Sequence, residues 1–205
     1  MHRLSSFISL VLFLGCATGA STQVLVTGQT AGKGNGVAFV SSNGVFADGI
    51  DAANNWGGVE VGIAGHIDLF GGGGAFSLPG HQFPYAVAGG LFGLPTRKLH
   101  FDASTYQVAI LPLYDRKDAS TSIINSALVV SKTFTLKRFT ITPYTGASWL
   151  YSLGPKDRMF SIPHCTFQIP FGISIPISEK LGLVIEYDEG STKSFGIALS
   201  YSFRI

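Results

Sequence analysis

The sequence predicts an all-β protein, an antiparallel transmembrane β-barrel of about eight to ten strands that follows an N-terminal signal peptide. Three observations lead to this prediction. Apolar and small or polar residues alternate with a period of two through most of the chain. Charged residues make up only 13% and gather between the alternating segments. After the N-terminus, no apolar run is long enough for a transmembrane helix.

The first element is the N-terminal segment, "MHRLSSFISLVLFLGCATGA". Arg3 gives it a basic start, an apolar core runs from Phe7 to Leu14, and small residues follow. This is the layout of a secretory signal peptide, so we expect residues 1–20 to be removed and residues 21–205 to form the barrel domain. The stretch "FLGC" also partly matches a lipidation signal, which would instead retain Cys16 as a lipidated residue.

Composition limits the possible functions. The chain has 14 Lys and Arg against 12 Asp and Glu, a net charge of +2, which argues against nucleic acid as a partner. If the signal peptide is removed, Cys165 is the remaining cysteine, and one cysteine cannot form an internal disulfide. The sequence contains no recognisable cofactor or metal motif, and we expect neither.

Long stretches of the chain carry no charge at all. Residues 139–155 and 159–178 contain no Asp, Glu, Lys or Arg. The second stretch contains Pro163, Pro170 and Pro176, which exclude a continuous helix. A soluble sheet normally presents charge on its outward strand face. We therefore expect the outward face to meet lipid, which also disfavours a soluble, lipocalin-like binding barrel.

The alternation, followed back from the C-terminus, predicts eight strands. They cover approximately residues 193–205, 181–188, 166–177, 139–151, 122–134, 104–114, 84–93 and 57–70. Two further candidates, residues 22–30 and 36–46, raise the count to ten, which we prefer over eight. One feature conflicts with closure, because Pro112, Pro143, Pro170 and Pro176 each remove a backbone donor from a sheet that has no free edge.

The chain ends "SFGIALSYSFRI", an unbroken alternation. With the signal peptide and the strand repeat over about residues 57–205, this ending resembles the small outer-membrane β-barrel proteins of Gram-negative-type bacteria. Tyr201, Phe203 and Ile205 match the C-terminal pattern that the assembly machinery reads in that family, although Phe is more typical than Ile at the last position.

The resemblance implies a location in the bacterial outer membrane. Outer-membrane lipid and the assembly machinery are the implied partners, and the outer loops are expected to meet extracellular ligands. In this family the C-terminal strand ends on the periplasmic side. The turns at 137–138 and 178–180 are then periplasmic. The connections at 71–83, 115–121, 153–165 and 188–193 are extracellular, with Gly71–Gly74 in a flexible outer loop.

The strongest polar constellation is Glu60, His66 and Asp68, which alternation places on one inward face. These residues could form a proton-transfer pair or a metal site, but an interior network that satisfies its own hydrogen bonds is the favoured interpretation. No catalytic motif is present, so we predict a structural or surface-interaction barrel that is not an enzyme. The alternatives are a narrow channel or small-solute transporter, and a lipid-modifying enzyme that would use Ser161 and His164.

Overall fold

The computed structural model describes residues 31–47, 50–96, 98–110, 122–137, 139–153, 165–190 and 193–205. The predicted signal peptide, Cys16 and the strand candidate 22–30 lie outside these residues. The strands are β1 (Asn35–Ala47), β2 (Ile50–Ala64), β3 (Ile67–Leu78), β4 (His81–Pro95), β5 (His100–Ile110), β6 (Ser122–Ser131), β7 (Phe134–Leu136), β8 (Phe139–Leu153), β9 (Cys165–Pro176), β10 (Leu181–Gly190) and β11 (Lys193–Arg204).

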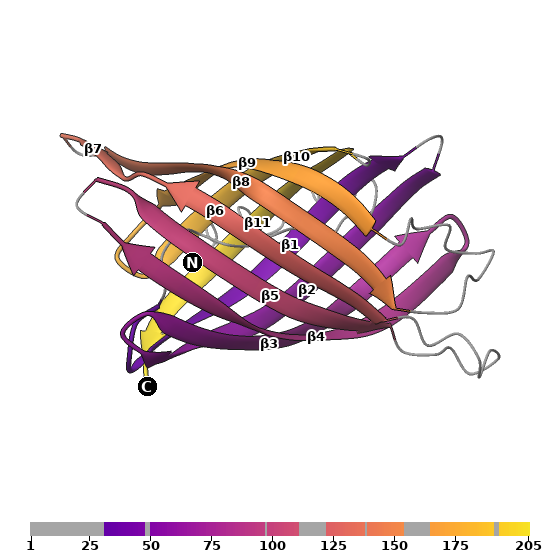
Figure 1. Ribbon diagram of the computed structural model, residues 1–205, viewed down its shortest axis with the longest axis horizontal. Helices are drawn as coiled ribbons and strands as arrows, with labels where there is room; N and C mark the ends of the chain where they lie inside the picture. The colour runs from indigo at the N-terminus through magenta and orange to yellow at the C-terminus, as the bar shows by residue number, and fades with distance from the viewer. Residues whose placement is uncertain are drawn as a thin grey trace, which may run out of the picture.

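The strands close into an antiparallel barrel (Figure 1). Each strand from β1 to β6 and from β8 to β11 pairs with its neighbour in sequence, and β1 closes the ring on β11. The short β7 pairs with the start of β8 and stands outside the ring, because β6 itself pairs with β8. The ring therefore has ten strands, and the predicted barrel is confirmed.

The register fixes the dimensions of the barrel. The shear of the barrel is the offset along a strand after one full turn of the ring from each residue to its cross-strand partner. Such a turn begins at Phe83 on β4 and returns to β4 at Pro95, so the shear is twelve residues. Twelve residues at about 3.3 Å each, set against ten strands about 4.8 Å apart, give a strand tilt of about 40°. The resulting backbone cylinder has a radius of about 10 Å, a space that large side chains fill.

The barrel has two distinct ends. At the near end, Asn35 of β1 and Arg204 of β11 are paired, and the turns at 65–66, 96–99, 137–138 and 177–180 lie there. The far end is formed by the opposite ends of the same strands, among them Ala47, Ile50, Leu153 and Lys193, and by the turn at 79–80. The resemblance to outer-membrane barrels predicts that the near end is the periplasmic one. The predicted turns 137–138 and 178–180 lie together at it.

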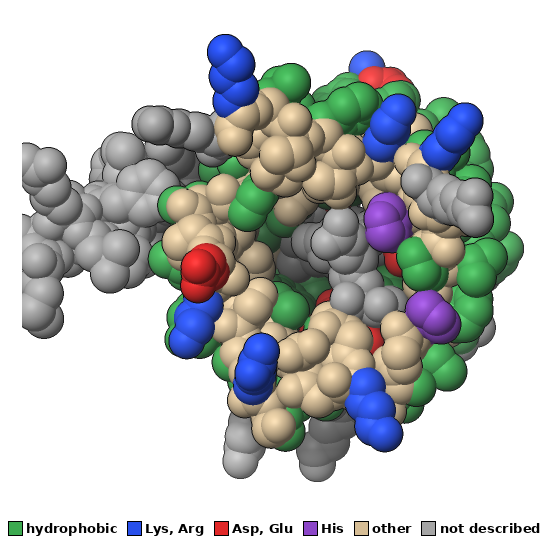
Figure 2. All heavy atoms as spheres, turned by 90° about the vertical axis from the view of Figure 1, so that its left-hand side faces the viewer, with side chains coloured by type: hydrophobic (Ala, Val, Ile, Leu, Met, Phe, Trp, Pro, Cys, Tyr) green, Lys and Arg blue, Asp and Glu red, His purple; other side chains and the backbone are tan. Residues whose placement is uncertain are grey.

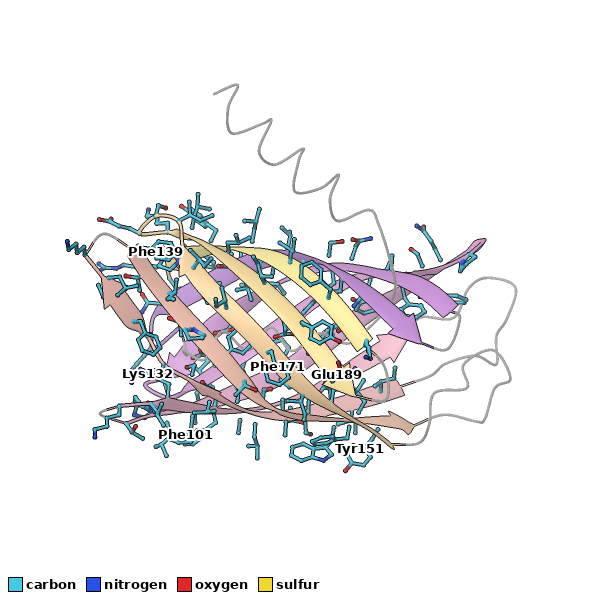
Figure 3. All side chains as sticks on the ribbon, turned by 90° about the horizontal axis from the view of Figure 1, so that it is seen from above. Phe101, Lys132, Phe139, Tyr151, Phe171 and Glu189 are labelled. Carbon is cyan, nitrogen blue, oxygen red and sulfur yellow. The ribbon has the colours of Figure 1, made fainter. Side chains whose placement is uncertain are left out.

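The outer surface is apolar, as the alternation predicts. Large hydrophobic side chains are exposed on strands all around the ring, and Phe101 and Tyr151 project away from the wall in Figure 3. Others are Val40, Val59, Leu69, Phe92, Leu128, Phe167, Phe171, Tyr187, Phe195 and Tyr201. Charged side chains instead gather at the rim, as Figure 2 shows for the near end. This combination suits a lipid-facing wall between two aqueous ends.

One predicted strand was wrong. The alternating segment 57–70 divides into the end of β2 and the start of β3, with a turn at Gly65–His66. The register shifts by one residue between Gly62 and Ala64, which marks a β-bulge. A two-residue turn would by itself reverse the order of inward and outward residues along the sequence. The bulge adds one residue, so the same order continues after the turn. The alternation therefore runs through the turn unbroken and conceals it.

The glycine run also lies elsewhere than predicted. Gly71–Gly74 belong to β3, not to an outer loop, and the far-end turn falls at Pro79–Gly80. A Cβ at Gly72 would overlap the Gly57 carbonyl, and one at Gly74 would overlap Trp56. The glycines are thus wall residues that allow β2 and β3 to approach closely.

Strand β5 begins four residues earlier than the predicted strand 104–114. The residues added to the strand include Asp102, a charged residue. Here its side chain is buried on the inward face, where polar groups are tolerated.

Of the four prolines named above, Pro143 and Pro170 lie within strands, and both sit at interruptions of the ladder. Pro143 lies opposite the break between β6 and β7, where its carbonyl accepts a hydrogen bond from the Lys132 N–H. Pro170 lies beside Gly146 and Ala147, which have no partners in the β8–β9 register. Pro176 is the last residue of β9, and Pro112 lies outside the described residues. The missing donors therefore fall where pairing is already broken, and closure is preserved.

Candidate functional site

The inward face of β2 and β3 brings together two of the three predicted site residues. Gly62 and Asp68 are direct cross-strand partners, and Glu60 precedes Gly62 by two residues on the same face. The Glu60 side chain is hydrogen-bonded to Asp68 and to the backbone of Ala31. The two carboxyl groups therefore lie within hydrogen-bonding distance of each other.

His66 does not join this pair. It lies in the exposed β2–β3 turn at the near end, where its carbonyl accepts a hydrogen bond from the Gly93 N–H. The turn hidden within the alternation explains the difference, because His66 was predicted on a strand that does not exist. Within the described residues, no three His, Cys, Asp or Glu side chains converge to hold a metal ion.

Asp102 is a third inward carboxylate that the sequence reasoning missed. It lies on β5, separated from β3 by β4, and its partner on β4 is Gly93. Because Gly93 is a glycine, the β4 position directly opposite Asp102 carries no side chain. The alternation of Asp102 with Ser104 was the signal that could have revealed it. Asp68 and Asp102 are both buried, with exposed fractions of 0% and 3%.

The chain before β1 contacts this acidic group. The Ala31 N–H donates a hydrogen bond to Asp68 Oδ2, and the Gly34 N–H donates to the Gly62 carbonyl. The Asn35 side-chain amide donates to the Ala31 carbonyl at 3.0 Å. Gly32 and Gly34 both have positive φ, which bends this segment onto the inner wall. We call residues 31–35 the N-terminal latch.

The inward face also carries a second polar group, on β8 to β11. Tyr144 donates a hydrogen bond to Glu186, and Ser194 donates to Asp188. Gln168 and Ser148 are buried on the same side of the sheet. Glu186 is thus an interior residue, as the alternation of β10 predicts.

An apolar layer crosses the lumen and completes the interior. Its buried members are Trp56, Phe83, Tyr85, Val87, Ile123 and Leu150, with Phe39, Phe70 and Phe76 packed against them. The Phe39 and Trp56 rings meet edge to face at 4.7 Å between centroids, and the Tyr85 hydroxyl donates to Asn54. A second cluster consists of Leu91, Ala127, Val129, Tyr144, Val184 and Ala198.

The residues predicted as an assembly signal lie on β11 and just beyond it. Tyr201 and Ile205 are exposed, and the Phe203 ring packs where a side chain at Gly36 would otherwise stand. The Ile205 N–H donates to the Gly34 carbonyl, which joins the last residue to the N-terminal latch. Their role as a signal remains a prediction. Ser161 and His164, proposed for an enzyme, lie outside the described residues.

Comparison with known proteins gives structural matches alone. No family model matches the chain, and no curated protein does. A de novo designed transmembrane β-barrel matches with 13% identity over 83% of this chain and 97% of its own, at a TM-score of 0.41. The N-terminal β-barrel domain of Pseudomonas aeruginosa OprF matches with 9% identity over 84% and 99%, at 0.40. The KdgM porin matches with 11% identity over 83% and 99%, also at 0.40.

These matches are too distant to carry an argument about function. The described part of the chain contains no helix long and apolar enough to span a membrane. The conclusion rests instead on the closed ten-strand ring and its exposed apolar wall. The chain is an antiparallel transmembrane β-barrel protein.

Proposed function

We propose that this protein resides in the bacterial outer membrane as a filled barrel, whose role is structural or depends on contacts made at its two ends. The apolar layer across the lumen is the observation that carries this proposal. A cylinder of about 10 Å backbone radius leaves room for a narrow pore only if its inward side chains are small. Here they include Trp56, Phe83 and Tyr85.

Burial supports a filled interior. Residues that line a water-filled pore are accessible to solvent, whereas Trp56 is only 8% exposed and Tyr85 only 7%. These side chains come from β2, β4, β6 and β8, so the layer is anchored on several sides of the ring. A barrel closed in this way offers its outer wall and its ends, and not a conduit, for function.

Planar-bilayer recording tests the proposal. We expect the wild-type protein to insert without discrete conductance steps. A Trp56→Gly/Phe83→Ala variant, which removes two members of the layer, should conduct. The control is Phe167→Ala, which removes an exposed aromatic ring from the outer wall and should stay silent. Regular conductance steps from the wild-type protein would overturn the filled-barrel proposal.

A second candidate is a narrow cation-selective conduit. Among the described residues, five carboxyl side chains point into the lumen, those of Glu60, Asp68, Asp102, Glu186 and Asp188. All described Lys and Arg side chains are instead exposed at the two ends. Within the described part of the chain, no group donates a hydrogen bond to Asp68 Oδ1 or to Asp102 Oδ2, and buried carboxylates attract a compensating cation.

Ion selectivity distinguishes this candidate. If the wild-type protein conducts, a salt gradient should give a reversal potential that favours cations, and Asp68→Asn with Asp102→Asn should reduce it. Lys193→Gln, at the far end, is the control for a charge change outside the lumen. Anion selectivity, or selectivity unchanged by both Asp→Asn substitutions, would exclude the acidic lumen as the determinant.

A further inference from the structure

Exposed cations surround the near end of the barrel. Six lie there, namely Lys33, Lys98, Lys132, Lys137, Lys180 and Arg204, and we call this set the basic collar. They belong to the N-terminal latch, to four different connections and to the end of β11, so they are spread around the circumference (Figure 2). Glu179 is the one fully exposed acidic residue at this end among those described. The rim therefore has a strong positive excess.

The collar cations are not neutralised within the described protein. At the far end, Lys193 forms an ion pair with Glu189, with Nζ and Oε1 3.2 Å apart. None of the six collar side chains forms an ion pair with a described residue. Lys132 lies instead over the Phe134 ring, 4.9 Å from its centroid. The collar thus presents free charge to whatever lies beside this rim.

The collar is continuous with the apolar wall. Lys137 follows exposed Leu136, Lys180 precedes exposed Leu181, and Arg204 precedes exposed Ile205. Figure 3 shows Lys132 and Phe139 close to the same end of the barrel. A cation beside the last apolar residue of a membrane wall can lay its alkyl chain along that wall and place its charge among lipid headgroups.

The arrangement of the charges selects the partner. A soluble partner would contact one side of the rim or cover the mouth, and would not meet outward cations on all sides of the barrel. A lipid leaflet encircles the barrel and meets the cations of the connections, Lys98, Lys132, Lys137 and Lys180, whereas Lys33 and Arg204 lie on the inward side of the same rim. We infer that the basic collar binds the phosphate groups of anionic phospholipids in the leaflet at the near end. Attraction to anionic headgroups adds up over several cations and is screened by salt.

The selectivity of the protein for anionic over zwitterionic lipid tests whether the basic collar binds anionic phospholipids. The full-length mature protein is reconstituted in phosphatidylcholine vesicles that contain a small fraction of spin-labelled phosphatidylglycerol or spin-labelled phosphatidylcholine. In low salt we expect the protein to bind spin-labelled phosphatidylglycerol several-fold more strongly than spin-labelled phosphatidylcholine. High salt should lower this preference towards one. A variant with all six collar residues changed to Gln should lose it, whereas Lys193→Gln should keep it.

A variant with three substitutions keeps the inference testable if the variant with six substitutions does not fold. The variant Lys98→Gln/Lys137→Gln/Lys180→Gln changes three exposed turn residues. The logarithm of its preference for phosphatidylglycerol should be about half that of the wild-type protein. Equal affinity of the wild-type protein for both lipids would overturn the inference, and so would full selectivity in a folded collar variant. Selectivity confined to added lipopolysaccharide would overturn it as well. The inference depends on the proposed membrane location. Failure to insert into any vesicle would contradict that location, whereas insertion without selectivity would contradict the collar alone.

Discussion

The Tyr144 hydroxyl donates a hydrogen bond to Glu186 across strand β9, with the two oxygen atoms 2.6 Å apart. Gly172 lies between them in the register, paired with Tyr144 on one side and with Glu186 on the other. A Cβ at Gly172 would overlap the Tyr144 ring. The tyrosine thus reaches the carboxylate only because the intervening strand carries no side chain at this point.

Removal of the Tyr144 hydroxyl tests the bond. Tyr144→Phe should lower the free energy of unfolding by about 1–3 kcal/mol, because a buried carboxyl oxygen loses its donor. Urea unfolding in detergent micelles, followed by circular dichroism, measures the change. Tyr151→Phe is the matched control, since the Tyr151 side chain is exposed on the outer wall and should change stability little. Equal effects of the two substitutions would show that the Tyr144–Glu186 bond adds no stability.

Gly172→Ala should be at least as destabilising as Tyr144→Phe, because the added methyl group displaces the ring and breaks the same hydrogen bond. Gly90→Ala is the control, since the nearest atoms to a Cβ there lie at 3.6 Å, an ordinary contact. Once Tyr144→Phe has removed the bond, Gly172→Ala should cost less than it does in the wild-type background. Strict additivity in the double variant would contradict a shared mechanism.

The N-terminal latch depends on Gly62. A Cβ at that position would overlap the backbone of Gly32, so Gly62→Ala should lift the latch from the inner wall. The hydrogen bonds from Ala31 to Asp68 and from Gly34 to Gly62 would then open. Hydrogen exchange of a peptide covering residues 31–35 should accelerate by more than about tenfold. Gly71→Ala, which has a 3.7 Å nearest contact, is the control. Unchanged protection of the latch would show that Gly62 is not required to hold it.

The sequence predicted the barrel and its lipid-facing wall because alternation and charge depletion are local properties of each strand. Strands β8 to β11 were located almost to the residue, since their turns carry charges that interrupt an apolar pattern. The same logic failed at two places. A bulge preserved the alternation through the Gly65–His66 turn, and Asp102 placed a charge inside a strand.

The interior could be predicted only in part. Alternation showed that Glu60 and Asp68 point inward, but their contact depends on how β2 pairs with β3. Asp102 joins them from another strand, and the apolar layer is assembled from side chains distant in sequence. Which inward side chains meet depends on the shear of the barrel, because the shear sets how the strands are offset from one another. A single sequence does not reveal the shear.

A pair of leucines tests whether the wall spans a membrane. Leu128 and Leu136 are similarly exposed, at 56% and 61%. Leu136 pairs with Phe139, the first residue of β8, whereas Leu128 pairs with Ala147, eight residues further along that strand. A charge near the middle of a lipid-facing wall costs about 2–4 kcal/mol, and one near the interface costs about 0–1 kcal/mol. Leu128→Lys should therefore destabilise the protein in lipid vesicles strongly, and Leu136→Lys only weakly.

The two leucine substitutions have different expected effects on stability if lipid surrounds the wall and if water does. Both variants are unfolded with urea in phosphatidylcholine vesicles, and the wild-type protein gives the reference. If water surrounds the wall, an exposed leucine can be replaced by lysine at either position with little effect on stability. Small and equal effects would thus contradict a membrane-spanning wall, even though the barrel itself would remain closed. A large cost confined to Leu128→Lys follows only if the middle of β6 and β8 lies in hydrocarbon while the β7 hairpin reaches the headgroups.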